Sequence, residues 1–341
     1  MDRFPSAVIA VLIGTLWLVP DHASAQVFLE HPLVKIQPDA SCSGSESLVV
    51  RAARNEYESF QVVVNGPASD VSVELSPLTG PGGTIPLSSF RRFRVVYLDI
   101  TQTSNDEGLL GRVPDGLVPV VDLFYGETRN AFPFDVPAGE NRLVWVDVFV
   151  PSETQAGEYS GTVTVSSAAG DEVLDLRLEV WGFDLPSTSS LDIAFGFEGW
   201  GNLFGHFDDP HSHYDDIVPL AQLYVTSALM HRITLESMLI EDWDLYADPI
   251  DWDAFDARWG SFFDGIDLPF GLQNARVTSV RLPTWGSTDA ERVAYWSEFA
   301  DHFRTKGWLD LVFDYTLDEP GDDPADYQAI IERSTRPSGR R

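Results

Sequence analysis

The sequence predicts a multidomain β plus α/β protein: an N-terminal β-sandwich over residues 26–186, then part of a (β/α)8 TIM-type barrel over residues 187–333. Three observations support this class. The length of 341 residues suits two domains. As far as Asp184, short alternating runs rich in β-branched and aromatic residues are separated by Gly, Pro, Asn and Asp. After residues 186–190, a plausible linker, strand-like segments alternate with helical ones.

Residues 1–25 are typical of a secretory signal peptide. An apolar run from Ala7 to Val19 precedes Ala23-Ser24-Ala25, a small-x-small pattern of the kind found before cleavage sites. The run is too short to span a bilayer. We therefore expect a secreted, periplasmic or cell-envelope protein without a membrane segment after cleavage, with an uncleaved anchor as the alternative.

The sandwich is predicted from six strand-like segments, which we place at residues 48–66, 90–100, 117–126, 141–151, 157–167 and 172–186. The segment from Asn141 to Val150 shows the pattern well. Leu143 and Trp145 share one face of it, and Val144 and Val146 share the other.

The barrel part is predicted to hold about four βα units, with strands at residues 191–197, 231–235, 276–282 and 311–317. Three helices have recognisable ends: one over residues 251–264 before Gly265, one opened by the capping box Thr288–Glu291, and one opened by Asp323-Pro324. In the second helix, the expected buried face is Val293, Trp296, Ala300 and Phe303.

Four units make about half of a barrel that typically takes about 250 residues. The polar, basic residues 334–341 begin where a loop into a fifth strand is due, and we expect them to be a disordered tail. The sequence thus reads as a fragment or a frame-shifted product, and a half-barrel that dimerises is the alternative. The encoding DNA beyond Arg341 distinguishes the two. The sequence indicates no particular oligomeric state.

Charge and cysteine content exclude several kinds of partner. There are 53 acidic and 22 basic residues, a formal net charge of -31, so the chain lacks the positive surface that nucleic acids and anionic membranes require. Cys42 is the single cysteine, which rules out an intrachain disulfide and leaves Cys42 without a role. His206, His211 and His213 lie among aspartates, but their spacing matches no zinc pattern, and we predict neither a metal nor a cofactor.

The candidate catalytic residues are Asp318 and Glu319, at the end of the fourth expected strand. Side chains alternate along a strand, so if Phe313 and Tyr315 pack under the helices, Asp318 points into the barrel. Active sites of such barrels lie at the C-terminal ends of the strands. A surface loop is the alternative, since neighbouring acids are common in so acidic a chain.

Adjacent carboxylates cannot easily flank a glycosidic bond, as the pair in an ordinary retaining hydrolase does. They suit substrate-assisted hydrolysis, in which the sugar's own 2-acetamido oxygen attacks the anomeric carbon. Asp318 would then orient the amide and Glu319 would protonate the leaving oxygen. The alternative is another retaining glycosidase whose second carboxylate is Glu198 or Glu236.

Other strand ends supply candidate substrate-binding residues. Parity places Glu198 at the end of the first expected strand, and Arg232, Thr234 and Glu236 inward along the second. Each of these charged groups could instead form a buried ion pair. The loop residues Trp200 and Trp285 are candidates for stacking on a sugar face, as an apolar ring can.

These residues together resemble a known family. The segments at residues 54–61, 150–151, 156–161, 195–197 and 231–232, with Asp318-Glu319-Pro320, are similar to glycoside hydrolase family 123 and its DUF4091 relatives. The resemblance covers most of residues 27–325 and implies a β-N-acetylgalactosaminidase acting on a glycan or glycoconjugate, with Glu319 as acid/base and Asp318 as the orienting residue. The alternative class is a non-catalytic carbohydrate-binding or envelope protein with an inactive barrel remnant.

Overall fold

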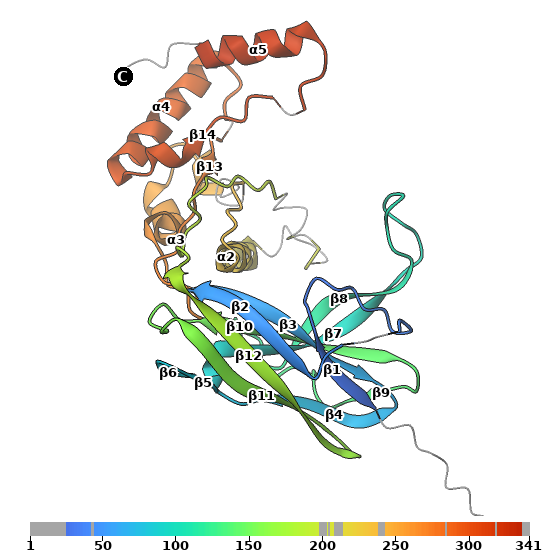
Figure 1. Cartoon of the computed structure of the whole chain (residues 1–341). Coiled ribbons are helices and arrows are strands. Elements are labelled where there is room, and N and C mark those ends of the chain that lie inside the picture. The colour runs from blue at the N-terminus through green and yellow to red at the C-terminus, as the bar shows by residue number, and fades with distance from the viewer. Residues whose placement is uncertain are drawn as a thin grey trace, which may run out of the picture.

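A computed structural model shows a β-sandwich at one end and a smaller, mainly helical part at the other (Figure 1). The described residues are 25–41, 44–197, 203, 205–207, 214–237, 243–283, 285–317 and 319–335. None of the helices in these ranges is both long and apolar enough to cross a membrane.

The sandwich is built from two mainly antiparallel sheets. The first has the strand order β1-β3-β10-β7-β8, and the second β2-β12-β11-β4-β9, with β5 paired to β11 and β6 paired to β5. The strands are β1 (Gln26–Glu30), β2 (Ser47–Arg54), β3 (Glu56–Asn65), β4 (Ala68–Leu75), β5 (Leu78–Gly80), β6 (Gly83–Ile85), β7 (Phe90–Ile100), β8 (Gly111–Pro119), β9 (Phe134–Val136), β10 (Asn141–Val150), β11 (Gly157–Ser167) and β12 (Gly170–Asp184).

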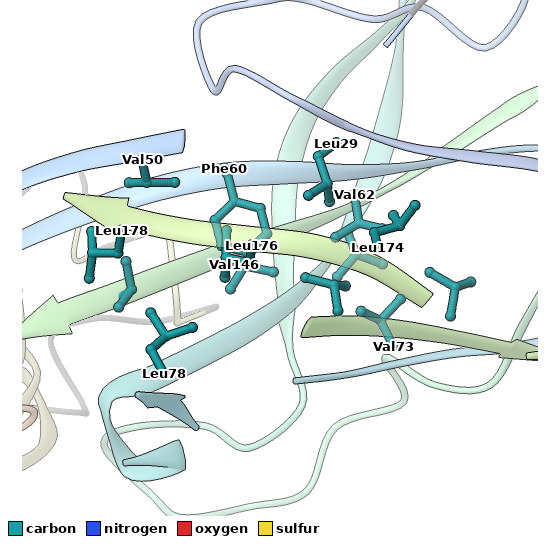
Figure 2. Close-up of a cluster of buried hydrophobic side chains, with 14 of the residues drawn as sticks. Leu29, Val50, Phe60, Val62, Val73, Leu78, Val146, Leu174, Leu176 and Leu178 are labelled. Carbon is teal, nitrogen blue, oxygen red and sulfur yellow. The ribbon is translucent and has the colours of Figure 1, made fainter. Parts of the chain in front are cut away.

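The core between the two sheets consists of alternate residues from their facing sides. Figure 2 shows Phe60, Val62 and Val146 of the first sheet against Leu174 and Leu176 of the second. Such burial of Val, Leu and Phe side chains stabilises each by about 1.5–3 kcal/mol relative to exposure.

The other side of the first sheet is covered as well. Leu143 is buried with Phe28, Ile36 and Val63, and Trp145 packs against this second cluster. The alternation predicted for β10 is therefore confirmed, with both of its faces in apolar surroundings.

One expected strand is misplaced. A strand was expected over residues 117–126, whereas β8 ends at Pro119. Asp122 explains the difference, because its Oδ1 accepts hydrogen bonds from the backbone N–H groups of Phe124 (2.9 Å) and Tyr125 (2.8 Å). A local aspartate turn of this kind competes with a strand ladder.

Within its described residues, the second part contains the helices α2 (Tyr214–Met230), α3 (Trp252–Asp264), α4 (Asp289–Lys306) and α5 (Pro324–Thr335) and the short strands β13 (Val280–Arg281) and β14 (Val312–Phe313). Short 3-10 turns are η1 (Leu87–Ser89) in the sandwich and η4 (Trp243–Tyr246) and η5 (Leu309–Leu311) in the second part.

The predicted helix ends are confirmed. The side chain of Asp251 caps α3 by accepting from the N–H of Ala254, and Thr288 with Glu291 forms the capping box of α4. Gly307 follows α4 in the left-handed conformation that favours glycine there.

The predicted buried face of α4 is partly wrong. Tyr295, Phe299 and Phe303 are buried, whereas Val293 is 59% exposed. Residues at i, i+4 and i+8 lie on one side of a helix, and the three aromatic rings occupy that side. Phe299 and Phe303 stack with ring centres 4.1 Å apart.

Parallel pairing in this part is limited to short pieces. β13 pairs with β14, and Phe195 forms an isolated parallel bridge with Leu235. The strands expected over residues 191–197, 231–235, 276–282 and 311–317 are thus much shorter than predicted.

Threonine side chains replace some of the backbone hydrogen bonds that would join the expected parallel strands. Thr278 donates its backbone N–H to Thr234 Oγ1 (3.0 Å), and Thr278 Oγ1 accepts from the N–H of Ile193 (2.9 Å). Backbone groups bonded in this way do not form a continuous ladder, although the first three expected strand segments still meet at Thr278.

The sandwich and the helical part share apolar surface. Phe149 of β10 belongs to the core cluster of the helical part, and Tyr57 of β3 packs against that cluster. The Tyr57 ring lies 4.8 Å from Phe149 and 5.5 Å from Phe270, and its hydroxyl donates to the carbonyl of Phe270. Burial raises the pKa of Tyr57 to about 12.

Candidate functional site

Glu319 of the predicted catalytic pair lies in the loop between β14 and α5. Asp318 falls outside the described residues. Glu319 is exposed and has a φ of 43°, which is uncommon for a residue other than glycine. The loop is fastened to α5, because the N–H of Gly321 donates to Asp326 Oδ2 at 3.1 Å.

The fourth segment leaves strand geometry earlier than expected. β14 ends at Phe313, while Tyr315 is 50% exposed and Leu317 is 37% exposed. The predicted packing of Tyr315 under the helices is therefore wrong, and strand parity does not extend to Glu319.

A charged cluster lies at the C-terminal ends of the second, third and fourth segments. Glu236 is buried, with 5% of the residue exposed, and its Oε2 lies 3.5 Å from Nε of Arg281. The guanidinium of Arg281 in turn lies 5.9 Å from the ring centre of Tyr315. Cationic groups are attracted to the face of an aromatic ring at such distances. The three residues thus link the ends of three neighbouring segments.

The inward orientation predicted for Glu236 and Thr234 agrees with these contacts. Sequence reasoning missed Arg281 and Tyr315 as partners of Glu236. Arg281 directly follows buried Val280. An arginine next to a buried strand residue was the sequence signal from which a partner for Glu236 could have been predicted.

Desolvation raises the pKa of Glu236, and the nearby positive charge of Arg281 opposes part of that rise. A raised pKa means that the folded state binds the proton more tightly than the unfolded state. The contribution of Glu236 to the free energy of unfolding is therefore fully present below its ordinary pKa of 4.5. It decreases as the pH rises through the folded-state pKa.

We expect replacement of Glu236 by glutamine to flatten the fall in melting temperature as pH increases above 4.5. Thermal unfolding across pH 4–8 measures this. The matched change at exposed Glu332 in α5 should leave the wild-type pH profile in place. Parallel profiles for wild type and Glu236→Gln would show that Glu236 does not contribute.

Arg232 has a different position from the predicted one. It has a φ of 58° in a turn over the first two residues of the second expected segment, and it donates from Nε to the carbonyl of Pro186 (2.7 Å) and from Nη2 to that of Asn55. The inward orientation expected for Arg232 is therefore wrong, because the strand begins after it. Its assignment to substrate binding stays a prediction.

A lysine at position 232 tests this assignment. Lysine keeps the charge but cannot donate through a planar fork to two carbonyls, so we expect a loss of about 1.5–3 kcal/mol in unfolding free energy. Denaturant unfolding measures it. Unchanged stability together with a raised KM for a glycan substrate would instead support a direct contact with the sugar.

The remaining predicted substrate-binding residues are placed only in part. Glu198 and Trp200 lie outside the described residues. Trp285 is half-buried and stacks on Tyr295, with ring centres 5.6 Å apart and planes 29° apart. One face of Trp285 is therefore occupied by protein, and sugar stacking on its other face stays a prediction.

Within the described ranges, no group of three or more His, Cys, Asp and Glu side chains is arranged to hold a metal ion. His206 forms a hydrogen bond of 2.8 Å with the hydroxyl of Tyr224. His211, His213 and Cys42 lie outside those ranges.

The residues quoted for the family resemblance have structural roles at the junction between the two parts. Arg54 forms an ion pair of 2.8 Å with Asp184, and the Asn55 side chain donates to the carbonyl of Leu185 and to Ser187 Oγ. With Tyr57 against Phe270, this segment joins β2 and β3 to the chain that leaves the sandwich.

Comparisons with known proteins concern the sandwich and the fold of the chain. Residues 33–167 match the model of the glycoside hydrolase 123 N-terminal domain. A solved family 123 glycoside hydrolase from Clostridium perfringens, whose structural analysis concerned glycolipid glycan hydrolysis, matches 91% of this chain with a TM-score of 0.59 and 12% identity. The match spans 60% of that chain's length.

The PapD-like domain of human CEP192 matches 53% of this chain and 99% of its own, with 13% identity and a TM-score of 0.22. No curated protein sequence matches significantly. The family resemblance predicted from the sequence is confirmed for residues 33–167, which match the N-terminal domain of glycoside hydrolase family 123, and the solved family 123 structure shares the fold.

Proposed function

We propose that this chain is the sandwich and part of the catalytic barrel of a secreted glycoside hydrolase that removes terminal β-linked N-acetylhexosamine, N-acetylgalactosamine above all. The relation to family 123 carries the proposal. The short parallel pairings of Phe195 with Leu235 and of β13 with β14 agree with a (β/α)8-type arrangement, in which the site lies at the strand ends.

In the proposed reaction the substrate's acetamido oxygen attacks the anomeric carbon, and the bond to the leaving oxygen breaks. Asp318 holds the amide N–H, while Glu319 gives its proton to the leaving oxygen. Glu319 then takes a proton from the water that opens the oxazolinium ion, so the acid is regenerated and the configuration is retained.

Substrate assistance makes the acetamido group itself part of the catalyst. The test is hydrolysis of 4-nitrophenyl N-acetyl-β-D-galactosaminide compared with the matching β-D-galactoside. The assay uses this chain and, if the reading frame continues beyond Arg341, the longer product. We expect turnover of the first substrate only. Equal turnover of both would overturn the substrate-assisted route, and turnover of neither would overturn the proposed activity.

A further inference from the structure

We propose that the sandwich carries a second binding site, for a sugar that bears a single carboxylate, in a groove beside β7 and β8. The groove has a volume of about 390 Å³, within the range of small-molecule sites. It is lined by Arg94, Val95, Val96, Tyr97, Arg112, Phe134, Asp135 and Arg142.

Three arginines in one groove are unusual in a chain with 22 basic residues and a net charge of -31. Two of them share one carboxylate. Glu140 accepts from Nη2 of Arg112 at 3.0 Å and lies 2.7 Å from Nη1 of Arg142. Hydrogen bonds from these arginines lower the pKa of Glu140, so it stays ionised and holds both guanidinium groups in place.

Arg94 differs from the other two. It is half-buried, and its guanidinium makes no hydrogen bond or ion pair within the described part of the chain. A guanidinium presents a planar set of N–H donors that matches the two oxygens of a carboxylate. Arg94 is therefore the group that an incoming carboxylate would engage.

The groove offers one guanidinium to a ligand. The carboxylates of Glu140 and Asp39 both act on Arg112, and Glu140 also pairs with Arg142, which leaves Arg94 to bind one negative charge. A polyanion such as a nucleotide would be repelled by the two carboxylates. Asp135 Oδ1 accepts from the N–H of Asp70 at 3.0 Å, and a carboxylate has further acceptor sites for sugar hydroxyl groups.

The rest of the groove suits a sugar ring. Val96 and the ring of Tyr97, both half-buried, supply apolar surface for the C–H face of a pyranose, and Val95 and Phe134 are buried beneath the groove. The Arg142 guanidinium lies 5.7 Å from the Tyr97 ring centre and helps to fix that ring. The groove thus combines a hydrogen-bond donor for a carboxylate, acceptors for sugar hydroxyl groups and an apolar surface. These are the features that recognition of a uronic acid requires.

The test is titration calorimetry of the whole chain with sodium methyl β-D-glucuronide, with methyl β-D-glucoside and with inorganic phosphate. We expect the glucuronide to bind at least about tenfold more tightly than the other two, because charge-assisted hydrogen bonds require its carboxylate. Added salt should weaken this binding. Absence of glucuronide binding, or equal affinity for glucoside or phosphate, would overturn the proposal.

Variants locate the binding. Arg94→Gln should weaken it about tenfold or more, and Arg94→Lys should weaken it less because the charge is kept. Arg177→Gln, at an exposed site on β12, makes the same charge change and should have no effect. Binding that survives in Arg94→Gln would overturn the site. Glu319→Gln should leave glucuronide affinity unchanged, which separates this site from the proposed catalytic one.

Discussion

Glu319→Gln is expected to lower kcat for release of N-acetylgalactosamine by about 10²–10⁴-fold, the usual contribution of general acid–base catalysis. Glutamine keeps the size of the side chain but cannot transfer a proton. The loss should be larger for a natural glycan than for a 4-nitrophenyl glycoside, because nitrophenolate leaves without much help from an acid. Steady-state kinetics with both substrates measures the difference.

Glu332→Gln is the matched control. It makes the same change at an exposed position in α5, and we expect its kcat to equal that of the unmodified protein. Turnover by Glu319→Gln at the control rate would remove Glu319 from the mechanism. Equal losses on both substrates would assign it a role other than proton donor.

Gly271→Ala is expected to destabilise the protein by roughly 2–4 kcal/mol, from backbone strain and from overlap in a packed core. Gly271 has a φ of 121°, a conformation that residues with a side chain rarely adopt. A Cβ there would lie 2.4 Å from Cε1 of Phe149, a buried ring of the sandwich. Denaturant unfolding gives the free-energy change.

Gly170→Ala separates the two causes. Gly170 is the first residue of β12, with a φ of 126°, and a Cβ there would meet no atom within 4 Å. We expect it to cost only the strain, about 1–2 kcal/mol. Equal losses at both positions would show that contact with Phe149 adds nothing to the effect at Gly271.

Part of the sandwich could be predicted from the sequence because alternation reports directly on which side chains are buried, whereas β1, β4, β5, β6 and β9 were not predicted. The strands expected at residues 90–100, 141–151 and 157–167 agree with β7, β10 and β11 to within one residue. Helix ends could be predicted for a similar reason, since Asp251 and Thr288 form their capping bonds within one turn of the chain.

The strands of the second part could not be delimited in this way. Their apolar runs fit a strand, but the side chain of Thr234 accepts a hydrogen bond from the backbone of Thr278 in place of a strand-to-strand backbone bond. A sequence pattern does not show which hydrogen-bond partner a threonine hydroxyl has. The candidate site could be predicted only where it depends on residues that are close together in the sequence. Glu236 could be found from parity, whereas its contact with Arg281 joins residues far apart in the chain.

Tyr57 and Asn55 also bear on how the protein is made. The sandwich emerges from the ribosome first, and domains generally fold as units in that order. Tyr57 and Phe149 are then already in place on the sandwich when Phe270 is synthesised, and the carbonyl of Asn55 is available for Arg232. The nascent helical part thus meets a folded apolar surface on which to assemble, so the sandwich serves as an intramolecular template for the helical part.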